Sequence, residues 1–474
     1  MLWIPALFVT NKSLWVDELL LALNFIEQDW SHLLHPLDYR QMAPIGFLLA
    51  TKCFAILFDN QDFAFKILPA FAWFASWFLF KKTLEFFKVS SLILWGTMAL
   101  FSSNFILLSY SYEFKQYSTD VFFSLTIYYF YLLIQDKKQI LPWLKFGFIL
   151  GISILFSNIA IVIMAALALI AFISDGKKFF SSFFFKTLIF QAIIFLLYYT
   201  KFLYQHPTEG YMLQYWKSKN AFFPSPNGFS FLIHKTQIIL NIVFNNKYIG
   251  LLIILISTST FFVKGKFSFF RLQNISFIIL FSHLILSALN KYPFENRFIL
   301  YIIPFILISL ACGFYKTEES IFFDKKKHFI FSVVTSASLL LAIIYGQMKN
   351  IQDLLNPKED IKSLMAEIEN RSESIDYLYI SEGAEVGFLY YRHFYPKTMQ
   401  LSFGLANSST SLPFSNKNFS NITLLLSHYS PFDTKEQDFE NKALLDAKRN
   451  GYDCSNKITS ERSVVILCKK KLFP

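Results

Sequence analysis

Charge is what this sequence of 474 residues has little of. Only 16% of its residues are Asp, Glu, Lys or Arg, whereas soluble domains carry roughly 25%. Hydrophobic residues make up 54%, and Phe alone accounts for 59 residues. This balance excludes a soluble globular protein and predicts an integral membrane protein. The net charge of +11 lies mostly in short loops, which indicates membrane orientation rather than nucleic-acid binding.

Cysteine is also scarce. Four cysteines are too few for a disulfide scaffold or a zinc site with recognisable spacing. Cys53 and Cys312 lie in apolar segments, where we expect them only to pack. Cys454 and Cys468 lie in the polar C-terminal part, and they could pair if that part faces an oxidising compartment. The sequence leaves this pairing open.

Several motifs that would indicate other functions are absent. The external loops contain no Asp-x-Asp, so we expect no required metal. Ser381-Glu382-Gly383 lacks the additional glycines of a phosphate-binding fingerprint. No internal repeat and no pair of broken helices is visible, which argues against a transporter.

Apolar segments predict a helical polytopic protein, because lipid cannot satisfy the polar groups of an open backbone. Residues 1–14 are apolar but short of the roughly 20 needed to cross the bilayer, and we expect them to be the outer end of a first span. Ten further spans bring the total to about eleven. They are predicted at about 63–80, 89–108, 118–134, 141–156, 159–173, 183–203, 248–263, 275–289, 298–314 and 329–345.

Alternate loops between these spans carry lysine and arginine, so we assign them to the cytoplasm. These residues are Lys81, Lys82, Lys88, Lys137, Lys138, Lys177, Lys178, Lys264, Lys266, Arg271, Lys316, Lys325, Lys326 and Lys327. The loops at 15–62, 109–117, 205–246 and 290–297 then lie on the extracytoplasmic face. Amphipathic helices are expected at 19–30 and 229–244, and a juxtamembrane or re-entrant helix at 45–58.

The composition becomes polar after Lys349. We therefore predict a membrane domain over 1–348 and a small soluble extracytoplasmic α/β domain over 349–474. Strands are expected at 376–381, 422–427 and 463–468, and helices at 360–371, 384–393 and 435–448. Strands that alternate with helices favour a small α/β sheet.

Acidic and basic residues gather on the predicted outer face. Asp17 and Glu18 follow the first apolar segment, Glu113 and Lys115 lie between two spans, and Arg297 lies in a late external loop. A carboxylate there can activate a hydroxyl acceptor while a cation neutralises a phosphate leaving group. The simpler interpretation is that the acids mark a helix end and the cations snorkel. Their shared face favours a site.

Four short motifs resemble the family 39 type of membrane glycosyltransferases, which have the GT-C fold and include protein O-mannosyltransferases and the aminoarabinose transferases of lipid A. The resemblance covers roughly residues 13–315. The motifs are Trp15-x-Asp17-Glu18, Pro36-Leu37-Asp38-Tyr39-x-Gln41-x-Ala43-Pro44, Glu113-x-Lys115-Gln116-Tyr117 and Arg297-x-x-Leu300-Tyr301-x-x-Pro304.

The resemblance implies inverting transfer of a sugar from a polyprenyl-phosphate donor to a lipid, glycan or protein acceptor, at the outer face of a bacterial plasma membrane. Asp17 would be the general base, Glu18 would orient the acceptor and Glu113 would be the second acid. The residues implied to hold the donor phosphate are Arg40, Lys115 and Arg297, and those implied to position the substrates are Tyr39, Gln41 and Tyr117. No cofactor is required, although Asp17 and Glu113 could share a divalent cation.

The chain departs from the family pattern in its short first span and in Arg40-Gln41-Met42, where relatives often have smaller residues. The acceptor therefore stays open. One alternative is a polymerase or ligase of lipid-linked glycans, which should have paired arginines in a large external loop, and residues 205–246 contain none. A transporter or flippase would place ionisable residues in mid-span, whereas they lie at span ends here.

Overall fold

The computed structural model describes residues 12–135, 140–204, 206–224, 227–253, 275–321, 325–355, 358–406, 414, 419–428 and 435–471. These residues form two compact units. The helical unit comprises Trp30–Asp59 and Ala64–Gln352, and the sheet unit comprises Asp353–Pro474 with the described parts of Pro5–Asp29 and Asn60–Phe63. Part of the predicted span 248–263, the basic residues Lys137, Lys138, Lys264, Lys266 and Arg271, and most of 407–420 lie outside the described residues.

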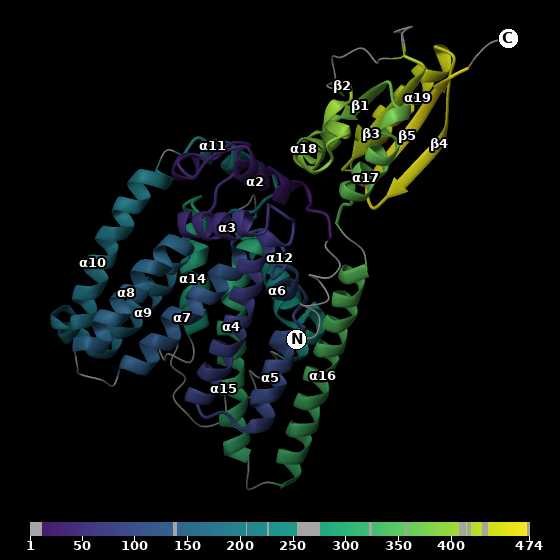
Figure 1. The fold of residues 1–474 in the computed structure, drawn as a ribbon. Helices are drawn as coiled ribbons and strands as arrows, with labels where there is room; N and C mark the ends of the chain where they lie inside the picture. Colours follow the sequence, from purple (N-terminus) through teal and green to yellow (C-terminus); the bar gives the residue numbers. More distant parts are fainter. Residues whose placement is uncertain are drawn as a thin grey trace. The chain divides into compact units, whose positions relative to one another are not determined.

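The helical unit is built of α-helices (Figure 1). Short 3-10 segments lie between some of them, and a π-helical turn, Tyr199–Leu203, follows α10. The helices are α3 (Ile45–Leu57), α4 (Ile67–Phe86), α5 (Ser91–Ser103), α6 (Phe105–Ser109), α7 (Tyr117–Gln135), α8 (Ile140–Phe156), α9 (Ala160–Asp175), α10 (Phe183–Tyr198), α11 (Glu209–Ser218), α12 (Gly228–Phe244), α14 (Ile275–Ala288), α15 (Ile303–Ile321) and α16 (Lys325–Leu355). The juxtamembrane helix expected at 45–58 is present as α3.

Four segments of the described chain are long and apolar enough to cross a membrane. They are Ala160–Ser181, Phe183–Leu203, Asn296–Tyr315 and Ser332–Gln352. Shorter apolar helices accompany them at Ile45–Leu57, Ser91–Ser103, Trp143–Phe156, Gly228–Phe244 and Ile275–Ala288. Large apolar side chains such as Phe148 (71% exposed) and Leu197 (64% exposed) cover outer faces of these helices. Such surfaces suit contact with acyl chains, as expected of an integral membrane protein.

The centre of the helical unit is α7, which contacts α4, α8, α9 and the 3-10 segment Asn296–Ile302. Phe114, in the loop before α7, is fully buried and packs against Phe47 and Phe65 at ring-centroid distances of 5.9 and 4.8 Å. Aromatic rings bury large areas and pair at such distances. The residues before α7 are therefore held firmly in the core.

The span predicted at 89–108 is not one helix. It divides at Asn104, where α5 ends and α6 begins. The Asn104 side chain accepts a hydrogen bond from Leu107 N (3.0 Å) and donates one to Ile242 O (2.7 Å). Asparagine is among the strongest helix N-caps, so this side chain starts α6 and ties it to α12. The hydrophobic pattern alone carries no sign of this break.

The sheet unit contains a five-stranded sheet in the order β2-β1-β3-β5-β4. The strands are β1 (Tyr377–Ser381), β2 (Phe403–Ala406), β3 (Asn421–Ser427), β4 (Tyr452–Ser460) and β5 (Ser463–Lys470). Strand β1 pairs in parallel with β2 and β3, whereas β5 is antiparallel to both β3 and β4. The predicted α/β domain is therefore present, and β2 and β4 are additional to the expected strands.

Helices cover both faces of this sheet (Figure 1). Helix α19 (Lys435–Arg449) buries Ala443 and Ala447 against a cluster that includes Leu424 and Ile466. Helices α17 (Ile361–Arg371) and α18 (Glu382–Tyr391) also contact strands of the sheet. Residues of β3 are buried from Ile422 to Ser427, as expected of a strand covered on both sides.

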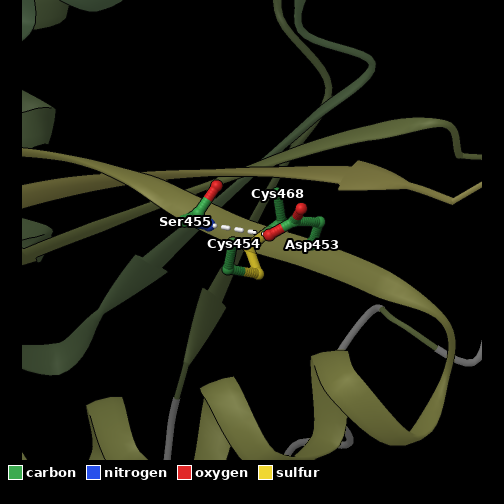
Figure 2. The surroundings of a disulfide bond; sticks show 4 residues. All are labelled: Asp453, Cys454, Ser455 and Cys468. Atoms are coloured by element: carbon green, nitrogen blue, oxygen red, sulfur yellow. Dashed lines mark hydrogen bonds between the residues drawn. A yellow bond between two sulfur atoms is a disulfide. The ribbon is translucent and has the colours of Figure 1, made fainter.

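Cys454 in β4 and Cys468 in β5 form a disulfide, with a Cα–Cα distance of 4.1 Å (Figure 2). The pairing that the sequence left open is therefore formed. Next to it, Ser455 N donates a hydrogen bond to Asp453 Oδ1 at 3.1 Å. The disulfide joins the edge strand β4 to its neighbour β5 in the interior of the sheet.

We expect Cys454→Ser to lower the free energy of unfolding of the sheet unit by about 3 kcal/mol, because the bond closes a loop with a sequence separation of 14 and loops of this size gain about that much. Urea unfolding of the full-length protein, monitored by the rate of proteolytic cleavage within β4, measures this change. The free Cys53 offers the control Cys53→Ser, which should leave the midpoint unchanged. If the urea midpoint of the wild-type protein were the same with and without reductant, the prediction would be wrong.

Candidate active site

The predicted acid pair lies in the sheet unit, in the first turn of helix α2 (Val16–Ile26). Helix α2 thus starts before the helix predicted at 19–30. Acidic residues are favoured in a first turn because the helix dipole is positive there. Trp15 N donates a hydrogen bond to Glu18 Oε2 at 3.1 Å, which satisfies a backbone donor at the helix start, as in a capping box.

The two acids differ in exposure. Glu18 is 3% exposed and directs one oxygen back to Trp15 N, whereas Asp17 is half-buried. A base must reach the proton that it removes. Asp17 is therefore the more accessible member of the pair, and Glu18 stabilises the turn that carries it.

Side chains from the C-terminal half hold the segment that leads into α2. The hydroxyl of Tyr391 accepts a hydrogen bond from Leu14 N at 2.8 Å, and Glu359 Oε2 accepts one from Val16 N at 3.1 Å. Helix α18 also packs on α2. The backbone is thus fixed on both sides of Trp15, immediately before Asp17.

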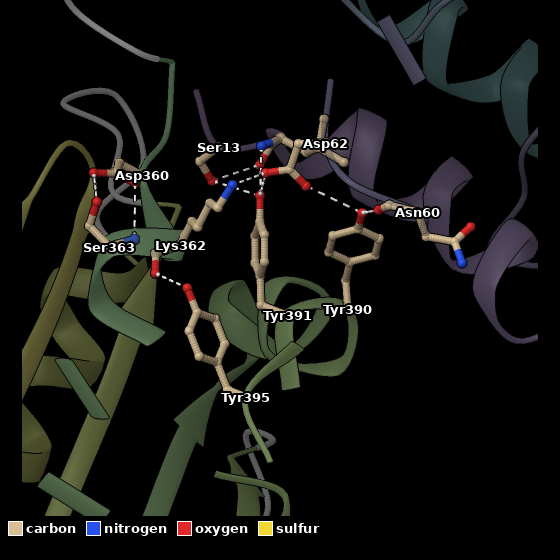
Figure 3. Close-up of polar contacts among 10 residues, drawn as sticks. Ser13, Asn60, Asp62, Asp360, Lys362, Ser363, Tyr390, Tyr391 and Tyr395 are labelled. Carbon is tan, nitrogen blue, oxygen red and sulfur yellow. Dashed lines mark hydrogen bonds and ion pairs between the residues drawn. The ribbon is translucent and has the colours of Figure 1, made fainter. Parts of the chain in front are cut away.

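A buried carboxylate, Asp62, accepts a hydrogen bond from Tyr391 (Figure 3). It lies 2.7 Å from Lys362 Nζ, 3.2 Å from the Tyr391 hydroxyl and 3.3 Å from the Tyr390 hydroxyl. Burial, together with the Asp62 charge, raises the pKa of both phenols well above the ordinary value. Both tyrosines therefore stay neutral and donate to Asp62. Asp62 is 3% exposed, and its charge is compensated by Lys362, as buried charges require.

Sequence reasoning missed Asp62, Glu359, Lys362 and the tyrosine pair. These residues lie beyond 349 or directly before the span at 63–80, where an isolated acid looks like a membrane boundary. The available signal was Tyr390-Tyr391, two neighbouring phenols that end an otherwise apolar stretch.

In the helical unit, three predicted residues lie together. Lys115 Nζ donates a hydrogen bond to Gln41 Oε1 at 3.0 Å, and Lys115 N donates to the carbonyl oxygen of Glu113 at 2.7 Å. Ser109 Oγ donates to Glu113 Oε1 at 3.1 Å. The side chains of Gln41, Glu113 and Lys115 are all at least 90% buried. The first loop and the 109–117 loop therefore meet, although Gln41 and Lys115 are 74 residues apart.

Arg297 lies among aromatic rings. Its guanidinium is 5.0 Å from the centroid of Trp216, 5.5 Å from Phe298 and 5.9 Å from Tyr117. A guanidinium over aromatic faces is held by cation–π attraction and stays charged. The predicted pair of Arg297 and Tyr117 is thus adjacent, and Trp216 is an additional neighbour, for which the sequence suggested only interfacial anchoring.

Arg40 and Tyr39 lie on the surface of the unit, next to Gln41 of the buried group, whose Nε2 donates a hydrogen bond to Tyr39 O at 3.2 Å. Both are exposed and both have positive φ angles of 56°, so they form a left-handed turn that non-glycine residues rarely adopt. The Arg40 guanidinium lies 4.3 Å from the ring centroid of Tyr211 in α11. This contact joins the first loop to the stretch at 205–246.

Two of the segments predicted to be external also contact each other. Lys235 Nζ in α12 lies 2.8 Å from Glu295 Oε2, and Phe294 N donates a hydrogen bond to Ala221 O at 2.7 Å. The segments at 205–246 and 290–297 are therefore neighbours, as their assignment to one face requires.

A cavity of about 130 Å³ opens beside the first loop. Its walls come from residues 33–48 and from the end of α10 with the following turn, and they include His35, Lys201 and His206. Burial lowers the pKa of His206, so this side chain is neutral at pH 7. The cavity combines apolar walls with a cation, a mixture that accepts an amphipathic molecule.

Within the part of the chain that the structure describes, no three His, Cys, Asp or Glu side chains gather in a way that could hold a metal ion. Asp17 belongs to the sheet unit and Glu113 to the helical unit. The expectations of a metal-independent site, and of a divalent cation shared by these two acids, stay predictions.

No family model and no curated protein matches this sequence. Among solved structures, the chain is similar to the crystal structure of ArnT from Cupriavidus metallidurans bound to undecaprenyl phosphate, with a TM-score of 0.55, 10% identity and coverage of 98% of this chain and 96% of that chain. The apo state of that ArnT gives a TM-score of 0.52 at 11% identity, with the same coverage. This likeness concerns the fold alone, and it agrees with the expected fold: the chain is a helical membrane protein with a small C-terminal α/β domain, similar in fold to that ArnT.

Proposed function

We propose that this protein transfers a sugar from a polyprenyl-phosphate donor to an acceptor at the extracytoplasmic face of a bacterial plasma membrane. The observation that carries the proposal is the similarity along 98% of the chain to ArnT, which was crystallised with undecaprenyl phosphate. A carrier lipid of that class suits a protein whose predicted residues Gln41, Lys115 and Arg297 lie in the helical unit. The half-buried carboxylate of Asp17 supports it further.

In the proposed reaction, Asp17 accepts the proton of the acceptor hydroxyl. The acceptor oxygen attacks the anomeric carbon as the bond from that carbon to the phosphate oxygen breaks, and the polyprenyl phosphate leaves with the electron pair. Attack opposite to the leaving group inverts the anomeric carbon. Lys115, Arg297 and Arg40 are the cations proposed to stabilise the negative charge of the leaving phosphate.

The other predicted residues support these groups. Gln41 accepts the hydrogen bond from Lys115, and Tyr117 lies beside Arg297, so we assign both to positioning the cations. Glu18 holds the turn of Asp17, and Glu113 is the proposed second acid. We assign Tyr39, in the turn with Arg40, to the entrance of the site. The cavity beside the first loop, with Lys201 in its wall, is a candidate position for part of the acceptor.

We also propose that the sheet unit faces the extracytoplasmic side. The Cys454–Cys468 disulfide supports this orientation, because disulfides persist in oxidising compartments and are rare in the cytosol. The basic loops assigned to the cytoplasm agree with it.

The donor class can be tested with purified protein and membrane extract. Radiolabelled polyprenyl-phosphate sugars should transfer their label to an acceptor in the extract, whereas nucleotide sugars should not. Chelation of divalent cations should leave the rate unchanged if no metal takes part. The absence of transfer from every lipid-phosphate sugar, combined with movement of such lipids across vesicle bilayers, would favour the flippase alternative.

A further inference from the structure

We propose that Tyr391 and Glu359 are positioning residues for Asp17, so that the sheet unit sets the orientation of the base in the sugar transfer. This inference rests on the proposed function. It concerns residues that lie more than 340 positions from the acid pair in the sequence and that make their contacts within one compact unit.

Glu359 connects the sheet to the start of α2. Its Oε1 accepts a hydrogen bond from Ser427 Oγ at 2.9 Å, while its Oε2 accepts the bond from Val16 N. Ser427 is the last residue of β3, and its hydroxyl lies 2.6 Å from that of Ser463 at the start of β5. Glu359 is 4% exposed. A buried carboxylate with both oxygens engaged has little freedom, so it fixes the N–H of Val16, the residue before Asp17.

Tyr391 provides the second anchor. Its hydroxyl accepts from Leu14 N, donates to Asp62 and lies 3.2 Å from Ser13 Oγ (Figure 3). It is 1% exposed. Because the N–H groups of Leu14 and Val16 are both hydrogen-bonded to side chains of the sheet unit, the path of the backbone into α2 is fixed. The orientation of the first turn of α2 is therefore fixed as well.

The Glu359 anchor lies at the carboxyl end of β3, through its contact with Ser427. In the sheet, β2 lies on one side of β1, and β3, the next strand along the chain, lies on the other side. The strand order therefore changes direction between β1 and β3, and the carboxyl ends of these two strands form a topological switch point. Open α/β sheets bind ligands at such points. Here Glu359 contacts that edge and holds the acid segment of the same chain. The sheet unit thus presents Asp17 at the edge where related architectures present a ligand site.

The test compares Tyr391→Phe and Glu359→Gln with the control Tyr452→Phe in the full-length protein. Tyr452 belongs to the same unit, and its hydroxyl also donates one hydrogen bond, to Phe419 O at 2.6 Å, but it does not take part in the anchors. We expect Tyr391→Phe and Glu359→Gln each to lower kcat about tenfold, with the KM for the lipid donor changed less than twofold. A tenfold change corresponds to about 1.4 kcal/mol. Tyr452→Phe should change neither constant.

A double-mutant cycle separates positioning from general stabilisation. If Tyr391 acts through Asp17, Tyr391→Phe should lower the residual rate of Asp17→Asn less than twofold, because residues that act as a unit are not additive. A further tenfold loss in that background would overturn the proposal, as would an unchanged kcat in Tyr391→Phe.

Amide hydrogen exchange of residues 13–18 gives a readout that needs no activity. Exchange at Leu14 should be at least tenfold faster in Tyr391→Phe and unchanged in Tyr452→Phe, and equal exchange in all forms would overturn the anchoring. If wild-type protein transfers no sugar, the proposed function has failed, and the catalytic part of this inference fails with it. The exchange experiment then still decides whether Tyr391 holds the acid segment.

Discussion

Asp17→Asn is expected to reduce sugar transfer by about 10²- to 10⁴-fold, the usual contribution of a general base. Asparagine has nearly the same shape, but it cannot accept the proton of the acceptor hydroxyl. The hydrogen bond that starts α2 comes from Trp15 N and Glu18, so the turn should survive the change. Initial rates with a radiolabelled polyprenyl-phosphate sugar measure the loss, and donor binding should stay within about threefold because the base contributes to the transition state.

The matched control for this change is Glu27→Gln. Glu27 caps the other end of α2, so the substitution removes one negative charge from the same helix without altering its first turn. We expect this variant to keep wild-type activity within a factor of about two. Equal transfer by wild type and Asp17→Asn would remove Asp17 from the role of base.

Lys115→Met is expected to lower kcat by about 10²- to 10³-fold, as measured for the loss of one charge-stabilising donor in other active sites. Lys115 is 8% exposed and is hydrogen-bonded to Gln41. A buried ammonium is effective against the charge of a departing phosphate because little water screens it. Methionine fills a similar volume without the charge. The measurement is single-turnover transfer, which isolates the chemical step from product release.

Two further variants control this result. Lys349→Met removes another partly buried lysine of the helical unit, whose Nζ donates to Asn245 O at 2.8 Å, and it should retain activity. Lys115→Arg keeps the positive charge and should recover part of the rate. A loss in Lys115→Met of less than threefold, with donor affinity unchanged, would show that Lys115 does not face the leaving group.

Local pattern explains why much of the sheet unit was predictable. The strands near 376–381, 422–427 and 463–468 are apolar runs, and they appear as β1, β3 and β5, the interior strands of the sheet with buried residues. Strand β4 was missed because it lies at the edge and is largely exposed. An edge strand needs few apolar side chains, so its sequence resembles a polar loop.

The candidate site was predictable only where its residues share a short motif. Glu113, Lys115 and Tyr117 occur within five positions and lie in one region of the helical unit, as their motif suggested. Trp216 beside Arg297, and Tyr391 beside Leu14, are contacts between distant parts of the chain. No periodicity connects such residues, because tertiary packing alone brings them together.

The contact between Leu14 and Tyr391 spans 377 positions of the chain. During synthesis, helix α2 leaves the ribosome long before Tyr391 has been translated. The backbone before the acid pair therefore lacks this anchor until the chain has been made as far as Tyr391 and the helix that carries Tyr391 has folded. Under the proposed function, a copy that stops before Tyr391 would carry Asp17 on a segment without this anchor.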